Sequence, residues 1–232
     1  TAFSAAPGGA HILGTDAIGR DVFARLMYGG RTSLLVGFVS TLISCAIGVP
    51  LGLVAGYARG KAEAVIMRIA DMMLAFPGLV LALAVAGIMG ASIKNAIIAI
   101  VVVSWTKYAR LARSMVLKVK KSLYIEAAVV NGTKTWKILL VHILPNMVTQ
   151  MVVTAAADIG TMMLELASLS FLGFGATAPT PEWGLMLNEG RTYMAKAPWL
   201  MIYPGIAIVI CVVVFNMLGD SIRDVLDPRQ DQ

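Results

Sequence analysis

Five long apolar segments constrain this chain more than any other feature of its sequence. They lie at about residues 32–57, 66–90, 95–116, 146–171 and 199–219. A bilayer core about 30 Å thick needs roughly 20 mainly apolar residues in one helix, and each segment meets that length. A helix also satisfies its backbone hydrogen bonds internally, as lipid requires. The sequence therefore predicts an all-α, polytopic membrane protein with five visible transmembrane helices.

The composition agrees with lipid as the main solvent of this chain. Apolar residues make up 58% of the sequence and charged residues 14%, whereas roughly a quarter of the residues in a soluble domain are charged. Pro50, Pro77 and Pro204 fall within the apolar segments and are expected to bend or interrupt the helices there.

The 19 Lys and Arg residues are divided unevenly between the two sets of loops. The larger set holds Arg59, Lys61, Arg68, Lys107, Arg110, Arg113, Lys118, Lys120, Lys121, Lys134, Lys137, Arg223 and Arg229. The smaller set holds Arg20, Arg25, Arg31, Lys94, Arg191 and Lys196. Because basic residues accumulate in cytoplasmic loops, the larger set is predicted to be cytoplasmic. Basic residues placed between apolar runs also argue against a nucleic-acid partner.

This orientation divides the chain into three parts. Residues 1–31 form an extracytoplasmic N-terminal segment, residues 32–219 the transmembrane domain, and residues 220–232 a cytoplasmic C-terminal tail. Because segment 1–31 has to be reached across the membrane, a further helix upstream would bring the total to six. The predicted location is the cell (inner or plasma) membrane, crossed several times.

An amphipathic stretch at residues 108–145 separates the third and fourth apolar segments and is too polar to span. It contains a spaced pattern of Glu126, Ala127, Ala128, Gly132, Leu144 and Pro145. The two alanines allow a short helix to bury one face against another protein, and Gly132 permits a turn after it. Pro145 can start the next helix because its φ is already set. We expect this protruding helix to be a docking element.

The pattern resembles the cytoplasmic signature of the permease subunits of binding-protein-dependent ABC importers. That signature reads Glu-Ala-Ala, three residues, Gly, nine residues, Ile, one residue, Leu-Pro. This chain departs from it at His142, which occupies the Ile position. The run from His142 to Asn146 is similar to the form of this signature in the peptide and nickel branch of the family. The departure at His142 therefore narrows the resemblance to that branch. Within that branch the chain looks like the second (C-type) of two paired permeases.

Further runs in the same order extend this resemblance over nearly the whole chain. They are His11–Asp16, Gly19–Asp21, Ser170–Gly173, Pro179–Gly184, Gly219–Asp220, Arg223–Asp224 and Leu226–Pro228. The resemblance implies that 32–219 is a permease domain with a coupling loop at about 117–145. The residues that it assigns to ATPase coupling are Glu126, Ala127, Ala128, Gly132, His142, Leu144 and Pro145.

The resemblance also implies the partners and the cargo. The partners are a second homologous permease subunit, two ATP-binding subunits that carry ATP and Mg, an extracytoplasmic substrate-binding protein and membrane lipid. The cargo would be di- or oligopeptides, or nickel and other metal chelates. This chain has no P-loop pattern to cradle nucleotide phosphates, so no cofactor is expected on it. It also lacks the metalloprotease and Gly-x-Ser-x-Gly motifs, which argues against an enzyme.

Asp158, Met162 and Glu165 in the fourth apolar segment form a candidate translocation path. The two carboxylates are seven residues apart and so lie on one helical face. A charge at this depth costs about 2.5 kcal/mol or more, so both should face a cavity or a partner and not lipid. They can line the path or form a structural pair with a neighbouring helix. In an ion channel or secondary transporter subunit, the alternative function, they would serve a proton or cation.

Several other side chains are given structural interpretations. Asp71 is expected to pair locally with Arg68, three residues before it. Met72, Met73 and the Met162–Met163 pair are interpreted as helix packing and not as soft metal ligands. The only histidines are His11 and His142, so no metal site is predicted. Cys45 and Cys211 have no metal or disulfide spacing and are interpreted as small core residues.

Gly48, Gly52 and Gly56 recur every four residues on one helical face. Such a stripe lets two helix backbones approach closely. The sequence leaves open whether the facing helix belongs to this chain or to a partner subunit.

Overall fold

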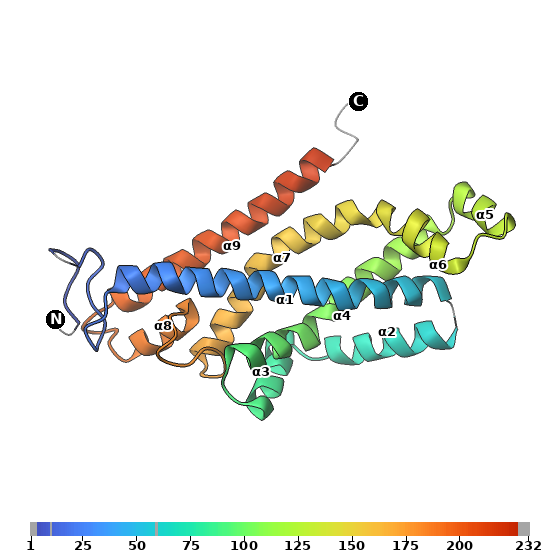
Figure 1. Ribbon diagram of the computed structural model, residues 1–232. Helices are drawn as coiled ribbons and strands as arrows, with labels where there is room; N and C mark the ends of the chain where they lie inside the picture. Colours follow the sequence, from blue (N-terminus) through green and yellow to red (C-terminus); the bar gives the residue numbers. More distant parts are fainter. Residues whose placement is uncertain (1–3, 10, 59, 227–232) are drawn as a thin grey trace. The chain divides into compact units, whose positions relative to one another are not determined.

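The computed structural model describes residues 4–9, 11–58 and 60–226 (Figure 1). The helices are α1 (Val22–Ala58), α2 (Lys61–Leu74), α3 (Gly78–Met89), α4 (Ile93–Val119), α5 (Leu123–Val130), α6 (Thr135–Lys137), the π-helix η1 (Ile138–Ile143), α7 (Pro145–Phe171), α8 (Trp183–Arg191) and α9 (Trp199–Leu226). No strand occurs within those ranges, so the all-α prediction is confirmed. Arg59, Asp227, Pro228 and Arg229, which entered the sequence predictions, lie outside the described residues.

The described helices differ from the five predicted spans in two places. Three of them, α1, α7 and α9, are long and apolar enough to cross a membrane, and α2 with α3 makes a fourth if the pair is one broken span. The interruption expected at Pro77 in segment 66–90 is present, because α2 and α3 meet at a 91° bend just before and at Pro77. Helix α4 carries five Lys and Arg residues and is not among the spans found. The count of five spans stays a prediction.

Helix α1 begins ten residues before the predicted start at 32 because Asp21 caps it. The Asp21 carboxylate accepts a hydrogen bond from the Ala24 N–H at 2.8 Å, the usual role of an N-cap residue. Pro50 and Pro204 are accommodated inside α1 and α9 without ending either helix. Only Pro77 interrupts a helix, as its position just before α3 shows.

The chain forms two compact units. Unit 1 comprises Thr1–Ser40, Ala82–Ile100 and Asp158–Asn216, and unit 2 comprises Thr41–Leu81, Val101–Ala157 and Met217–Gln232. The core of unit 1 gathers Val22, Met163, Ala167, Trp183, Met186, Ala197, Leu200 and Ile208. The core of unit 2 gathers Leu53, Tyr108, Ala112, Val116, Ile125, Ile138, Ile143, Met147 and Met151. Neither Cys45 nor Cys211 is part of a disulfide.

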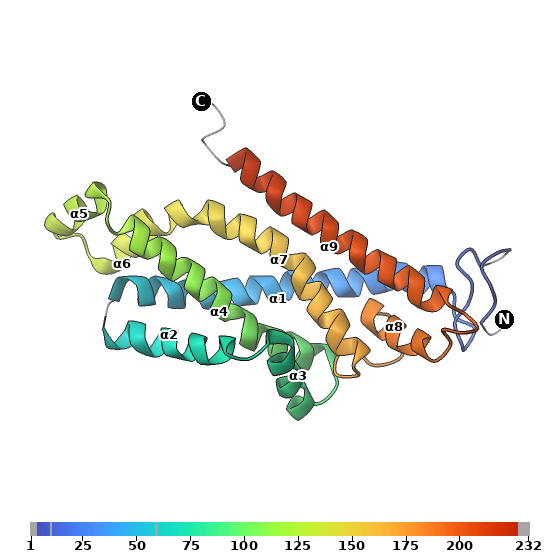
Figure 2. The ribbon, with the colours of Figure 1, turned by 180° about the vertical axis from the view of Figure 1, so that it is seen from behind.

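The glycine stripe of α1 packs against α4 within this chain, which resolves the alternative left open by the sequence (Figure 2). A Cβ at Gly52 would lie 2.5 Å from the Cβ of Ala112, and one at Gly56 would lie 2.6 Å from the Cβ of Val116. A Cβ at Gly48 would overlap the Trp105 carbonyl oxygen. The two helices are therefore in close contact at three successive glycines of the stripe.

We expect Gly52→Ala to destabilise the protein. Alanine by itself favours a helix over glycine by about 1 kcal/mol, but overpacking at a closed contact costs about 1–3 kcal/mol. The matched control is Gly87→Ala in α3, where the added Cβ would meet only Phe174 Cε1 at an ordinary 3.5 Å. The measurement is the thermal midpoint of each variant in nanodiscs. Equal midpoints for both variants would contradict the close contact.

Candidate functional site

The predicted docking helix is α5, and a turn at Gly132 ends it as expected. Gly132 has φ of 73°, its N–H donates to the Val129 carbonyl at 3.0 Å, and the Thr133 N–H donates to the Ala128 carbonyl at 3.0 Å. This pair of bonds is the Schellman arrangement, which places a left-handed residue just after a helix. No atom would lie within 4 Å of a Cβ at Gly132. The glycine is therefore required by φ and not by close approach within the described chain.

Helix α5 leaves most of its surface uncovered. Ile125 is its only buried residue, while Leu123 and Val130 are 83% and 86% exposed. Glu126 and Ala127 are exposed and Ala128 is half-buried. Trp136 follows the turn and is also exposed. Exposed apolar surface of this kind can contact either a protein partner or a membrane.

The second half of the candidate coupling loop forms a π-helix that the sequence did not predict. In η1 the Leu144 N–H donates to the Leu139 carbonyl at 2.8 Å, a bond across five residues. His142 lies in this turn, half-buried, and its carbonyl accepts from Asn146 Nδ2 at 2.6 Å. Single π-turns occur often at functional sites. Pro145 begins α7, as predicted.

One basic residue just past the end of α4 connects the start of the loop to α1. Lys120 donates to the Tyr57 carbonyl at 2.8 Å, and its ammonium lies 4.5 Å from the centre of the Tyr57 ring. Beneath α5 is a cavity of about 530 Å³ that Ile125, Glu126 and Val129 help to line. The loop is thus tied to α1 at one end and bordered by open space beneath α5.

The candidate path residues lie on α7. Asp158 is 2% exposed and Met162 is 3% exposed, while Glu165 is half-buried. Met163 is fully buried in the core of unit 1, which agrees with the helix-packing role expected of the Met162–Met163 pair. The burial of Asp158 matches the requirement that a charge at this depth avoids lipid. Within the described ranges, no three His, Cys, Asp or Glu side chains are placed to hold a metal ion.

The local pair predicted between Asp71 and Arg68 is wrong. Asp71 pairs with Arg110 of α4, and on the same two helices Glu63 accepts from Arg113 at 2.5 and 3.0 Å. Both possible partners are arginines, so the packing of α4 beside α2, and not the type of residue, decides which guanidinium reaches Asp71. A signal was present, because Glu63 and Asp71 share one face of α2.

In unit 1, the run before α1 builds a charged cluster that sequence reasoning missed. Gly14 and Gly19 adopt φ of 78° and 83°, and Asp16 Oδ1 between them accepts from the Ile18 and Arg20 N–H groups at 3.0 and 2.8 Å. This is an Asx-type turn, in which a carboxylate replaces backbone acceptors. The turn aims Asp16 at the first turn of α1.

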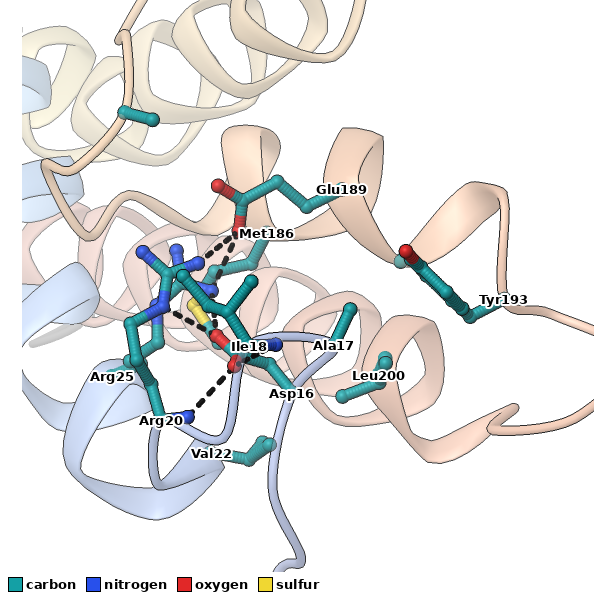
Figure 3. Close-up of a pocket in the computed structure, with 12 residues that line it drawn as sticks. Asp16, Ala17, Ile18, Arg20, Val22, Arg25, Met186, Glu189, Tyr193 and Leu200 are labelled. Carbon is teal, nitrogen blue, oxygen red and sulfur yellow. Dashed lines mark hydrogen bonds and ion pairs between the residues drawn. The ribbon is translucent and has the colours of Figure 1, made fainter. Parts of the chain in front are cut away.

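The second oxygen of Asp16 joins two arginines to Glu189 of α8 (Figure 3). It accepts from Arg20 Nε at 2.6 Å and from Arg25 Nη1 at 2.9 Å. Glu189 Oε2 accepts from the same Arg25 nitrogen at 2.6 Å and from Arg20 Nη2 at 3.1 Å. The cluster therefore ties segment 1–31 to α8.

Hydrogen bonds set the charge states in this cluster. Burial by itself raises the pKa of Asp16, but donation by the Arg20 backbone, the Arg20 side chain and the Ile18 backbone brings its pKa below the usual value. Burial likewise opposes the charge on Arg20, yet the hydrogen bond to Asp16 and the charges of both carboxylates raise its pKa. Both shifts favour the ionised forms of Asp16 and Arg20.

Glu182 and Trp183 show what the Pro-Glu-Trp-Gly run does in the fold: its side chains cap α8 and bond to α1. Glu182 is fully buried, caps α8 by accepting from the Gly184 and Leu185 N–H groups at 2.9 Å, and accepts from the Ser33 hydroxyl at 3.1 Å. Trp183 donates to the Leu26 carbonyl at 2.7 Å. Sequence reasoning missed this cap because Ser, Thr, Asp and Asn, and not Glu, are the usual N-cap residues.

Comparison with known proteins gives matches over most of the chain. Residues 48–232 match the family model described as binding-protein-dependent transport system inner membrane component. The chain is 48% identical to the glutathione transport system permease protein GsiD of Pectobacterium atrosepticum, over 96% of this chain and 74% of that protein. It is 45% identical to the dipeptide transport system permease protein DppC of Alkalihalophilus pseudofirmus, over 96% and 73%. It is 44% identical to the probable D,D-dipeptide transport system permease protein DdpC of Escherichia coli, over 96% and 75%.

The fold is similar to that of a solved chain as well. A chain of the MetNI methionine ABC transporter, in an inward-facing conformation, matches with a TM-score of 0.74 and 20% identity. The match covers 88% of this chain and 97% of that chain.

Proposed function

Because this chain belongs to the family of binding-protein-dependent transport system inner membrane components, we propose that it forms part of the path by which an importer takes up short peptides. The chain is a permease subunit of an ATP-binding-cassette importer and not an enzyme, in agreement with the motifs. An ion channel or secondary transporter, the alternative drawn from the sequence, does not fit this family. The relatives are named for glutathione and dipeptides, which favours peptide cargo over nickel or other metal chelates.

The observation that carries the coupling mechanism is the exposed apolar surface of α5. A short helix held by one buried residue, Ile125, offers Leu123 and Val130 to a partner. We infer that α5 docks in a groove of an ATP-binding subunit and that η1 and Pro145 pass its movement to α7. Two such subunits, with ATP and Mg bound to them, and a second permease would complete the machine, and a substrate-binding protein would deliver solute from outside.

The division into two units supports the proposed orientation. Every described basic residue predicted to be cytoplasmic falls in the ranges of unit 2, and every described one predicted to be outside falls in unit 1. A folded chain that separates the two sets in this way is consistent with the positive-inside rule. The proposed topology places the C-terminal tail in the cytoplasm and segment 1–31 outside.

The first prediction concerns coupling at Gly132. Valine at φ of 73° is strained by roughly 1–2 kcal/mol, and about 1 kcal/mol already changes an equilibrium about fivefold. Gly132→Val should therefore lower solute-stimulated ATP hydrolysis and uptake together, at least about fivefold. Gly132→Asn is the matched control, because asparagine tolerates this conformation. The measurement is ATPase activity of the reconstituted complex, with a pull-down of the ATP-binding subunits. Full solute stimulation of ATP hydrolysis in the Gly132→Val variant would contradict the proposal that α5 passes movement to α7.

The second prediction concerns topology. In a background lacking Cys45 and Cys211, Met194→Cys should react with a membrane-impermeant maleimide in intact cells, and Lys121→Cys should react only after permeabilisation. Both positions are exposed, so burial does not confound the comparison. Labelling of Lys121→Cys from outside would reverse the proposed orientation.

The third prediction concerns the candidate path. If Asp158, Met162 and Glu165 line it, Asp158→Asn and Glu165→Gln should each lower the peptide uptake rate several-fold while the ATP-binding subunits still co-purify. Asp224→Asn, an exposed carboxylate near the end of α9, is the control and should transport normally. Unchanged uptake in both α7 variants would exclude these carboxylates from the path.

A further inference from the structure

Three cavities of unit 2 follow one face of the C-terminal half of α1. Their volumes are about 310, 380 and 530 Å³, and the largest is the cavity beneath α5. The α1 residues that line them recur about every four positions and so share one helical face: Cys45, Ala46, Val49, Pro50, Val54, Tyr57 and Ala58. This face is opposite the glycine stripe that packs against α4, because residues two apart differ by about 200° around a helix.

The first of these cavities, of about 310 Å³, is apolar on both sides. Opposite α1 it is lined by the start of α7 and the residue before it: Leu144, Val148, Met151 and Val152. Val148 and Val152 are 48% and 44% exposed, so this wall is open to the surroundings of the chain. The surroundings of an apolar helix in a membrane are hydrocarbon. An acyl chain is therefore the kind of group that suits this cavity.

The cavity beneath α5 has a basic edge at the other end of the same face. Lys120 and Lys121 line it, together with the carboxylate of Glu126. Lys121 is exposed, and the Lys120 ammonium lies 4.5 Å from the centre of the Tyr57 ring. Residues 117–145 include five lysines, and Glu126 is their one acidic residue. This excess of positive charge favours an anionic partner.

Aromatic side chains mark the level at which the apolar part of the face ends. Tyr57 lines both the middle cavity and the cavity beneath α5. Trp136 is 60% exposed and directly follows Thr135, which lines the middle cavity (Figure 1). Trp and Tyr are enriched where hydrocarbon meets the lipid headgroups. Lysine extends past that level, since it keeps its charged end in a polar environment while its stem covers apolar surface.

The length of the face agrees with this assignment. Cys45 and Tyr57 are twelve residues apart, which is about 18 Å along a helix. One leaflet contributes about 15 Å to a hydrocarbon core that is about 30 Å thick. The apolar part of the face thus has the length of an acyl chain in one leaflet, and lysines stand where its headgroup would lie.

We propose that this face of unit 2 binds one anionic phospholipid, with its phosphate beside Lys120 and Lys121 and an acyl chain along residues 45–54 of α1. A soluble phosphate would use the basic edge alone and leave the apolar cavity empty. Basic pockets at the cytoplasmic ends of membrane helices suit such lipids. Binding of the lipid does not depend on the proposed transport function, and only its assignment to the cytoplasmic leaflet rests on the proposed orientation.

The direct test places the assembled transporter in nanodiscs of phosphatidylcholine that contain a graded fraction of phosphatidylglycerol with a photoreactive diazirine in its acyl chain. Crosslinks mapped by mass spectrometry should lie in residues 45–54 or 144–152, and their yield should saturate as the labelled fraction rises. Unlabelled phosphatidylglycerol should lower the yield, and extra phosphatidylcholine should not. A yield that never saturates, or crosslinks that avoid both segments, would overturn the site.

A lysine variant tests the headgroup end. Lys121→Gln should raise the lipid fraction at half-saturation about fivefold, the value of one lysine beside an anionic lipid. The matched control is Lys118→Gln, because Lys118 is exposed at the same end of α4 but does not line the cavities. Equal shifts in the two variants would mean a diffuse attraction between lysines and lipid, and not a site.

An alanine variant tests the acyl end. Ala46→Phe fills the apolar cavity from α1 and should also raise the lipid fraction at half-saturation, although no charge is changed. Ala64→Phe is the control, since Ala64 is an exposed alanine of α2 that lines none of the three cavities. Parent-like half-saturation in Ala46→Phe would contradict an acyl chain at this place.

Two further measurements exclude other occupants. Glycerol phosphate at millimolar concentration should not compete with the labelled lipid, and full competition by it would reduce the site to one for soluble anions. Lys121→Gln should leave co-purification of the ATP-binding subunits unchanged. Loss of these subunits with unchanged half-saturation would assign the basic edge to a protein partner and overturn the lipid site. Absence of ATP-driven uptake by the parent transporter, with crosslinking intact, would instead contradict the proposed function.

Discussion

The contact of the α1 backbone with α4 at Gly48, Gly52 and Gly56 is the interaction on which unit 2 is built. Two helices that touch through their backbones gain packing without relying on a hydrophobic drive, which lipid does not provide between apolar helices. Because α4 is fixed in this way, its guanidinium groups reach the carboxylates of α2 and its end holds the loop that leads to α5. Helix α5, the proposed docking element, therefore follows a closely packed pair of helices. A lever needs such a support, since movement at its tip is otherwise lost in bending.

The features that could be predicted from the sequence are those that depend on one residue and its neighbours along the chain. The turn after α5 needs a left-handed residue, so Gly132 could be identified from its place in the pattern, and Pro145 marked the start of α7 in the same way. The all-α class followed from segment length and hydropathy. The bend at Pro77 was foreseen as a possible break, but its size was not, because a proline permits an interruption without specifying the angle.

Distant partners account for what the sequence did not predict. Asp71 has an arginine one turn away and pairs instead with one 39 residues later, because helix packing decides which guanidinium arrives. Ser33 bonds to Glu182, and Arg25 of the Asp16 cluster bonds to Glu189. Each pair is more than 140 residues apart in sequence, and no local pattern brings such groups together. These long-range pairs give the family runs near both ends of the chain a structural meaning. Their glycines, carboxylates and tryptophan fold one segment against another.

The π-turn of η1 has a consequence for the evolution of the coupling loop. A π-turn is equivalent to one residue inserted into an α-helix. Removal of one residue between Ile138 and Ile143 would restore α-helical hydrogen bonding in this stretch. It would also rotate the preceding segment, including α5, by about 100° relative to α7. The side chains of α5 would then point in another direction although every one of them was retained. The length of this short stretch therefore fixes the direction in which α5 projects, and a deletion there should be harder to tolerate than most single substitutions nearby.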